Sequence, residues 1–291
     1  VMWQGAGRVA GHLGLDKLIM FYDSNNVQLS TDCDAVSSED VAAKYRAWNW
    51  YVQEIAGNDP EAIREALRNA KAETERPSLI IGHTTMGKGC LTAEGANFEG
   101  KCSTHGQPLS KSGADFAATV AHLGGDAANP FVVFPEVEAM YKARAEELKA
   151  MANARYAAYY EWKQAHPTLA NEYEAYMSGE TPCIDWSKIQ QKPNAATRNA
   201  SATVLGYFVE IVGNMVVSSA DLSNSDKTDG FLKKSKALAK GDFSGAFLQA
   251  GVSELTMACV CMGMAFHGGI IPACGTFVVF SDYMKPAVRM A

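Results

Sequence analysis

The feature that most constrains the fold of this chain is a repeated alternation of short apolar runs with segments of helical periodicity. Short runs that are apolar throughout are typical of strands buried on both faces of a parallel sheet. After a small-residue helix at 2–14, the expected strands are 18–24, 51–57 and 77–85, and the expected helices between them are 37–48 and 58–73. This order predicts a doubly wound α/β domain, because consecutive parallel strands need a helix to cross between them.

The composition changes in the middle of the chain. From Pro135 to about Ser178 the residues are mainly Ala, Glu, Lys, Arg and Tyr at helical spacing, and Pro167 is the one break. This pattern predicts a long helical connector with solvated faces, followed by a loop-rich linker. The α/β order then resumes with a helix at 200–212, a strand at 215–222, a helix after Glu254, a strand at 269–277 and a last helix from near Ser281. We therefore expect two doubly wound parallel-sheet domains, 1–134 and 196–291, joined by a connector and linker at 135–195.

Composition and charge exclude several classes of protein. The 291 residues are 47% apolar, which is enough for two cores, and the net charge of -6 is spread along the chain without a basic stripe. Nucleic acid and anionic membranes are therefore poor candidate partners. No apolar run is long enough for a membrane span, and no basic, apolar leader is visible. Seven cysteines without a C-x-x-C pair predict reduced, buried thiols in a cytoplasmic protein.

The ends of the chain are unusual. It starts at Val1 without a methionine and stops within what reads as an unfinished helix. We therefore expect a piece of a longer protein.

Polar residues that follow predicted strands are the first candidates for a site, because ligands of parallel sheets bind at the carboxyl ends of strands. Asp23, Asn25 and Asn26 follow the first strand and carry oxygens that Mg²⁺ or Ca²⁺ accepts, although Asp and Asn also form ordinary turns. Gly87 and Gly89 flank a lysine and could cradle a phosphate, or could belong to an ordinary glycine loop.

Three further places carry candidate residues. His105 lies between small residues in a predicted loop, where a histidine is less often core filler. A cluster of polar residues follows the predicted strand 215–222, and either a site or a hydrogen-bonded turn would explain it. Aromatic residues three apart form a stripe before the last helix, a pattern that more often belongs to a core. The polar residues are Asp221, Ser225 and Asp226, and the aromatic residues are Phe277, Phe280 and Tyr283.

Glu254 is the one acid at the head of a long apolar run. An ionised carboxylate moved into apolar surroundings without a partner costs several kcal/mol, so its placement needs a reason. A functional role is one reason. The other is structural, because acids are favoured in the first turn of a helix and Ser253 could be the N-cap.

Six separated pieces of the sequence together resemble the transketolases, which are thiamine diphosphate enzymes. They are Asn25, THGQPL at 104–109, ADLSNS at 220–225, GVSELTM at 251–257, HGG at 267–269 and TFVVFSDYMKPAVRM at 276–290, in the family's order and approximate spacing. The resemblance covers nearly the whole chain. It implies that the first domain binds the cofactor's diphosphate and the second its aminopyrimidine. It also implies that the amino-terminal part of the first domain and the carboxyl-terminal part of the second are missing, and that the isolated fragment is inactive.

The resemblance also implies roles for individual residues. Asn25 and the carbonyl of Val27 resemble ligands of Mg²⁺ or Ca²⁺, and His105 resembles a catalytic histidine near the diphosphate and the substrate. Arg198 and Ser225 match positions that hold the substrate's phosphate. Asp221 matches an acid near the thiazolium, and the aromatic stripe at 277, 280 and 283 matches the aminopyrimidine pocket. Glu254 falls on the catalytic glutamate that hydrogen-bonds the pyrimidine ring.

The function implied is transfer of a two-carbon ketol unit from a ketose phosphate to an aldose phosphate in the pentose phosphate pathway, by a homodimer with its sites at the subunit interface. Two alternatives stay open at this point. One is a deoxyxylulose-phosphate synthase, which shares the cofactor and fold but uses pyruvate. The other is a non-catalytic half of a split thiamine diphosphate protein.

Overall fold

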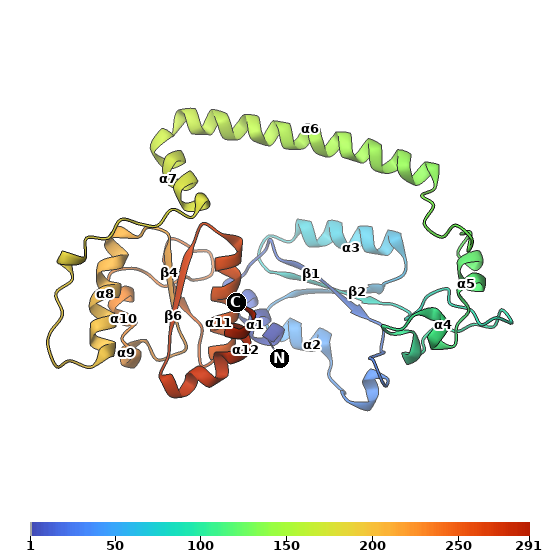
Figure 1. Cartoon of the computed structure of the whole chain (residues 1–291), viewed down its shortest axis with the longest axis horizontal. Helices are drawn as coiled ribbons and strands as arrows, with labels where there is room; N and C mark the ends of the chain where they lie inside the picture. The colour runs from blue at the N-terminus through green and yellow to red at the C-terminus, as the bar shows by residue number, and fades with distance from the viewer. Residues whose placement is uncertain (1) are drawn as a thin grey trace. The chain divides into compact units, whose positions relative to one another are not determined.

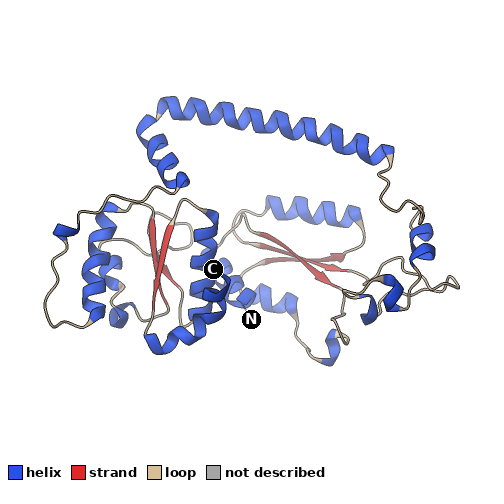
Figure 2. Ribbon diagram, in the orientation of Figure 1, coloured by secondary structure: helices blue, strands red, loops and turns tan. Residues whose placement is uncertain are grey.

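The computed structural model describes residues 2–291, which divide by their internal contacts into two compact units. Unit 1 comprises residues up to 14 and 155–291, and unit 2 comprises residues 15–154. Each unit contains a three-stranded parallel sheet with helices packed on it (Figure 1, Figure 2). The α/β prediction with two parallel sheets is confirmed.

The sheet of unit 2 contains β1 (Ile19–Ser24), β2 (Tyr51–Ala56) and β3 (Ser78–His83) in the order β1-β3-β2. The helices α2 (Val41–Ala47) and α3 (Pro60–Ala72) pack against this sheet and lie on opposite sides of it (Figure 1). All three strands are parallel, so their carboxyl ends and the loops that follow them gather at one edge. That edge is where the sequence predicts a ligand.

The strands of unit 2 differ in burial. The central strand β3 is buried at Leu79, Ile80 and Ile81, as its apolar run predicts. β1 was expected to be buried as well, but Phe21 is 42% exposed and Tyr22 is 37% exposed. That prediction was wrong, because within residues 2–291 the helices α2 and α3 pack mainly over β2 and β3 and leave Phe21 and Tyr22 of β1 uncovered.

Local capping signals explain where the helices of unit 2 begin. The Asp59 carboxylate accepts hydrogen bonds from Glu61 N at 2.9 Å and from Ala62 N at 3.4 Å, with Pro60 in the first turn. Proline is tolerated there because its missing N–H would have had no partner inside the helix. Asp40 caps α2 in the same way, by accepting from Ala43 N at 2.8 Å.

The connector is helical as predicted. It consists of α6 (Pro135–Ala165) and α7 (Pro167–Ser178), and the break falls at Pro167, which cannot donate an intrahelical hydrogen bond. The boundary between the two units falls inside α6. Between β3 and α6, the chain forms the short helices α4 (Leu109–Ser112) and α5 (Phe116–His122). Among residues 2–291, no helix combines the length and the apolar character that a membrane crossing requires.

Unit 1 is built on β4 (Met215–Ser219), β5 (Phe247–Gln249) and β6 (Ile271–Gly275), in the order β5-β4-β6. Its α-helices are α1 (Met2–Leu13), α8 (Thr197–Ile211), α9 (Ser223–Asp226), α10 (Asp229–Leu232), α11 (Glu254–His267) and α12 (Lys285–Met290). The longer helices α8 and α11 lie on opposite faces of the sheet (Figure 1). β5 was not predicted, because three residues are too few to show a period.

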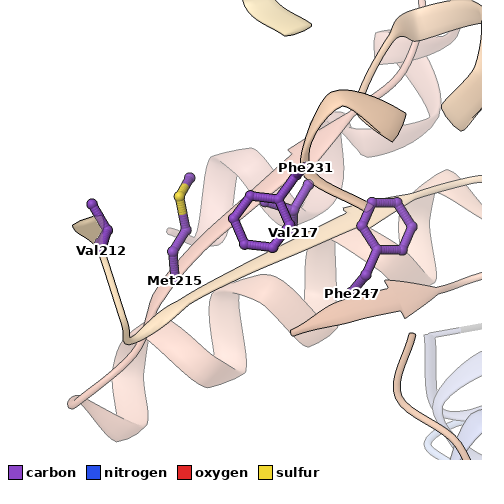
Figure 3. Packing of buried hydrophobic residues seen from close by; sticks show 5 residues of the cluster. All are labelled: Val212, Met215, Val217, Phe231 and Phe247. Carbon is purple, nitrogen blue, oxygen red and sulfur yellow. The ribbon is translucent and has the colours of Figure 1, made fainter. Parts of the chain in front are cut away.

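One buried cluster holds the sheet of unit 1 to α8 and α10. Figure 3 shows its five side chains, which come from the end of α8, from β4, from α10 and from β5. They are Val212, Met215, Val217, Phe231 and Phe247. Phe231 is 1% exposed and Phe247 is fully buried, so the two rings supply much of the apolar area that holds β5 in place.

The start of the last helix differs from the prediction. A 3₁₀ helix runs from Val278 to Met284, and the α-helix α12 begins only at Lys285. Pro286 lies in the first turn of α12, where its missing N–H costs nothing. The predicted start near Ser281 was therefore about one turn too early.

Helix α1 packs against α11 within unit 1. A Cβ atom added to Gly5 would overlap Oγ1 of Thr256, a residue of α11 that is 5% exposed. Arg8, one turn later, donates a hydrogen bond of 2.8 Å from Nη2 to the carbonyl of Ala250. Glycine at position 5 is therefore required for the two helices to approach this closely.

Replacing Gly5 by alanine should reduce the free energy of unfolding by about 1–3 kcal/mol, because the added methyl group overpacks the contact between α1 and α11. The matched control is Gly263→Ala in α11, where a Cβ would meet nothing within 4 Å. That change should be neutral or should stabilise the protein by about 0.5–1 kcal/mol, since alanine is the better helix former. Urea unfolding of both variants measures the difference, and equal effects would contradict the packing argument.

Candidate functional site

A cavity of about 450 Å³ lies at the carboxyl end of β4 in unit 1. It is formed by the residues that follow β4, the residues that lead into α11, and the 3₁₀ helix after β6. The lining residues are Ala220, Asp221, Leu222, Val252, Glu254, Phe280 and Tyr283. Four predicted site residues, Asp221, Glu254, Phe280 and Tyr283, are therefore brought together although they are far apart in the sequence.

Glu254 is the first residue of α11 and is 9% exposed. Within residues 2–291, its carboxylate makes no hydrogen bond or ion pair, so the N-terminus of α11 alone offsets its partial removal from water. Ser253 occupies the N-cap position, but its side chain makes no capping hydrogen bond. A capping role for Ser253 is thus wrong, and the Glu254 carboxylate is left available to a ligand in the cavity.

The aromatic stripe forms a stack. The ring centroids of Phe277 and Phe280 are 6.1 Å apart with planes at 28°, and those of Phe280 and Tyr283 are 6.3 Å apart with planes at 22°. A 3₁₀ helix has three residues per turn, so residues three apart lie directly above one another. Tyr283 is 62% exposed, so this stripe is not simply core.

A buried polar network shapes the segment after β4. The Asp226 carboxylate accepts hydrogen bonds from Ser219 Oγ at 2.9 Å and from both the backbone N and Oγ1 of Thr228 at 2.8 Å. Both carboxylate oxygens of Asp226 thus accept hydrogen bonds from neighbouring residues, and Asp226 has a structural role, as the hydrogen-bonded-turn alternative predicts. Asp221 lies in the same turn with a φ of 66°, an unusual backbone conformation that places it at the wall of the cavity.

Arg198 and Ser225 are also brought together. Nη1 of Arg198, in the first turn of α8, donates to the carbonyl of Ser225 at 3.3 Å. Arg198 lines a second cavity of unit 1, of about 560 Å³, together with Asp226, Thr276 and Phe277. One guanidinium near a helix N-terminus is a suitable partner for an anion.

In unit 2, the loop after β1 is held by its own side chains. Oδ1 of Asn25 accepts a hydrogen bond of 3.0 Å from the backbone N of Val27, and Asn26 has a φ of 57° and donates to Asp34 at 3.1 Å. Asp23 accepts from Thr84 Oγ1, at the end of the neighbouring strand. The turn alternative therefore holds, although an amide oxygen keeps a second lone pair for a metal ion.

The loop with His105 lies next to the loop after β1. The Cys102 thiol donates to Asp32 Oδ1 at 3.4 Å, and Asp32 forms a β-bridge with Val27. Burial and then this Asp32 carboxylate raise the pKa of the Cys102 thiol. Nδ1 of His105 is buried and has no hydrogen-bond partner. This nitrogen is therefore available to a ligand, because buried polar atoms are usually hydrogen-bonded.

The glycine loop at 87–89 is not an open phosphate cradle. The backbone N of Gly89 donates to Oε1 of Glu99 at 2.7 Å, and Lys88 lies 3.6 Å from the same oxygen. The hydrogen bond from Gly89 is the largest cause of the lowered pKa of Glu99. The anion that this loop holds is therefore a carboxylate of the same unit.

No group of three or more His, Cys, Asp or Glu side chains among residues 2–291 could hold a metal ion by itself. The cysteines are free thiols, but only Cys90 and Cys261 are buried, and Cys183 is exposed. The prediction of uniformly buried thiols was therefore wrong, since spacing in the sequence does not report exposure.

Two protein-family models match the chain. The transketolase thiamine diphosphate binding domain matches residues 3–182, and the transketolase pyrimidine binding domain matches residues 193–291. The chain belongs to the transketolase family. The cavity with Glu254 thus lies in the part that matches the pyrimidine binding domain.

Individual transketolases are similar over nearly the whole chain. Transketolase 2 of Escherichia coli is 36% identical over 97% of this chain, and the transketolase of Halalkalibacterium halodurans is 36% identical over 98% of it. Among solved structures, the transketolase of Leishmania mexicana has a TM-score of 0.90 at 30% identity and covers 99% of this chain. The chain spans 42% of the length of each of these three proteins.

Some lining residues could not be found from the sequence. Ala220, Leu222 and Val252 are apolar walls of the cavity with Glu254, and nothing in their sequence context separates them from core residues. The contact of Arg8 with the segment before α11 could not be found either, because its partner is a backbone carbonyl 242 positions away.

Proposed function

We propose that these residues are the cofactor-binding part of a transketolase, which transfers a two-carbon ketol unit from a ketose phosphate to an aldose phosphate. The observation that carries the proposal is the cavity in which the unpaired Glu254 carboxylate faces stacked aromatic side chains. A solved transketolase of Pichia stipitis, 28% identical with a TM-score of 0.86, is described as a complex with sedoheptulose-7-phosphate, which supports a sugar phosphate as substrate.

The residues of this cavity fit the aminopyrimidine of thiamine diphosphate. A flat heteroaromatic ring stacks favourably on aromatic side chains, which Phe280 and Tyr283 offer. Its ring nitrogen can share a proton with a carboxyl group, and Glu254 is a carboxyl group that lacks a protein partner. The cavity thus offers both the stacking surface and the hydrogen-bonding group that such a ring needs.

When bound, thiamine diphosphate would supply the carbon nucleophile and the electron sink for carbon–carbon bond cleavage. The protein supplies orientation and proton transfer. Glu254 would hold a shared proton against the ring nitrogen and so would let the site move protons at neutral pH without a strong free base. Arg198 pairs with the substrate's phosphate with help from the Ser225 hydroxyl, and Asp221 orients the reacting end.

In unit 2, we assign two functions to the loops after the strands. Nδ1 of His105 is unpaired in a loop beside the Asn25 turn, so it can donate to or accept from the diphosphate or a substrate hydroxyl. Asn25 Oδ1 and the carbonyl of Val27 are the proposed ligands of Mg²⁺ or Ca²⁺. Both ions prefer oxygen ligands, and the remaining ligands would be phosphate oxygens and water.

Replacing Asn25 by alanine should weaken metal-dependent binding of thiamine diphosphate by about 10- to 100-fold, the usual cost of disturbing the ligand shell of a metal. Asn25→Asp keeps an oxygen in the same place and serves as the matched control. Calorimetric titration with the cofactor at fixed Mg²⁺ concentration measures both. Unchanged affinity in Asn25→Ala would remove the metal assignment.

Sugar exchange tests the function. A protein form containing these residues should transfer a ketol unit when given a ketose phosphate, an aldose phosphate, thiamine diphosphate and Mg²⁺. Product formation only with pyruvate as donor would favour the deoxyxylulose-phosphate synthase alternative. Cofactor binding without any transfer would favour the non-catalytic alternative.

The remaining assignments are also proposals. We propose a cytoplasmic homodimer with sites at the subunit interface, and domain boundaries near residues 134 and 195. Sedimentation of a catalytically active form that showed only monomers at micromolar concentration would exclude the dimer.

A further inference from the structure

Asp226 is a buried carboxylate of unit 1 that has no basic partner among residues 2–291. It is 8% exposed, and its hydrogen bonds come from neutral groups. Oδ2 accepts from the Ser219 hydroxyl, and Oδ1 accepts from the backbone N and the hydroxyl of Thr228. Burial of a carboxylate is costly unless hydrogen bonds compensate it, so Asp226 and its three donors stabilise one another's positions.

These hydrogen bonds join the ends of two strands to the turn that contains Asp226. Ser219 ends β4 and is fully buried, and its hydroxyl also accepts from the backbone N of Leu222 at 3.2 Å. Gly275 ends β6, and a Cβ there would lie 2.5 Å from Cγ2 of Thr228 and 3.5 Å from Oδ2 of Asp226. The turn is therefore hydrogen-bonded to β4 and packed on β6, and the Asp226 carboxylate lies where these contacts meet.

The same turn sets the position of Arg198. The backbone N of Asp226 donates to the Leu222 carbonyl at 2.8 Å, and the Ser225 carbonyl belongs to the same planar peptide group. The direction of this carbonyl is therefore fixed, and it accepts from Nη1 of Arg198 at 3.3 Å. A guanidinium has five N–H donors, so others remain for an anion. Arg198 and Asp226 both line the cavity of about 560 Å³.

Asp226 itself is unsuited to bind a phosphate. Both of its oxygens already accept hydrogen bonds, and a carboxylate repels another anion. Any effect of Asp226 on a bound anion must therefore pass through the residues that it positions, of which Arg198 is a cation that lines the cavity.

We propose that Asp226 is a positioning residue for the phosphate group of the sugar substrate. Its carboxylate holds the turn at 222–228, so that the Ser225 carbonyl aligns Arg198 with the cavity. This role rests on the proposed function, in which Arg198 pairs with that phosphate. Asp226 thereby contributes to the selection of phosphorylated over unphosphorylated sugars, although it touches neither.

Calorimetric titration with D-erythrose 4-phosphate and with D-erythrose tests the proposal in a protein form that contains these residues, because the two aldoses differ only in the phosphate. Asp226→Ala should raise the Kd for the 4-phosphate by about 10- to 100-fold, the range expected when a binding group is misplaced, and should leave the Kd for erythrose unchanged. Asp226→Asn should stay near the wild-type value. It keeps an oxygen toward Thr228, and its N–H group can donate to the Ser219 hydroxyl.

A double-mutant cycle shows whether Asp226 acts through Arg198. Arg198→Ala alone should weaken binding of the 4-phosphate, and adding Asp226→Ala to it should cost no further affinity. Additive losses would overturn the proposal, because the two residues would then act independently. Thr228→Val covers the case in which Asp226→Ala fails to fold, as judged by circular dichroism. It keeps the shape but removes one donor to Asp226, so it should raise the same Kd by a smaller factor and should also be non-additive with Arg198→Ala.

Asp242→Ala is the matched control, because the Asp242 carboxylate also holds a turn of unit 1, by accepting from the backbone N of Ser244 at 3.1 Å. It should not change the Kd for the 4-phosphate, and a loss equal to that of Asp226→Ala would overturn the proposal.

The outcomes separate this role from the proposed function. If Asp226→Ala binds the 4-phosphate as tightly as the wild type, the positioning role is rejected, while sugar exchange by the wild type still supports the proposed function. If the wild type binds the 4-phosphate through Arg198 and Asp226 but exchanges no sugar, the proposed function fails and the positioning role is supported. Equal affinity of the wild type for the two aldoses would overturn the positioning role, because no phosphate contact would exist.

Discussion

Replacement of Glu254 by glutamine is expected to lower kcat by about 10²- to 10⁴-fold in a form of the protein that transfers ketol units. Glutamine keeps the shape of the side chain and some hydrogen bonding, but it cannot exchange a proton with the aminopyrimidine. Cofactor affinity should fall much less, because stacking on Phe280 and Tyr283 is retained. The size of the effect follows from the role of a positioned acid or base.

The unfolding free energy separates this role from a structural one. In the described residues, the Glu254 carboxylate has no protein partner, so the variant should lose at most about 1 kcal/mol from the helix N-terminus. Asp282→Asn is the matched control. The Asp282 carboxylate lies 2.7 Å from Nζ of the exposed Lys285, so its replacement should not affect turnover. Exchange of the cofactor's C2 proton, followed by NMR, is the direct readout. A wild-type exchange rate in Glu254→Gln would reject the catalytic assignment.

Phe247→Ala is expected to destabilise unit 1 by about 3–5 kcal/mol, the usual cost of removing a buried aromatic ring. Phe247 is fully buried and packs with Val217 and Phe231 in the cluster that holds β5. β5 leads within a few residues to Glu254. Loosening of β5 in Phe247→Ala should therefore also weaken cofactor binding, because a larger fraction of the protein is unfolded.

Phe243→Ala provides the control for that prediction. Phe243 lies four positions earlier and is 52% exposed, so the change should alter stability by no more than about 0.5 kcal/mol. Urea unfolding followed by far-ultraviolet circular dichroism compares the two variants. Similar midpoints for both would show that the cluster around Phe247 does not hold β5.

Much of the fold follows from local signals. Asp59 and Pro60 mark the start of α3, and Pro167 marks the break in the connector, because capping and the missing proline N–H act within one turn. The apolar run of β3 correctly predicts a buried strand. The similar run of β1 does not, because a strand's burial depends on which helices cover it, and α2 and α3 pack mainly over β2 and β3.

For the site, residue types and spacing single out most of the candidates, whereas Val27 and Arg198 come only from the resemblance to the transketolases. An acid at the head of an apolar helix, and aromatic residues three apart, are visible without a structure. The groups that these side chains contact are not visible in the sequence. That the Ser253 side chain makes no capping hydrogen bond, that Glu99 fills the glycine loop and that Asp23 meets Thr84 beyond the neighbouring strand are visible only in the folded chain. The sequence specifies the elements through interactions within one or two turns, whereas the partners of each polar side chain are decided by which elements pack together.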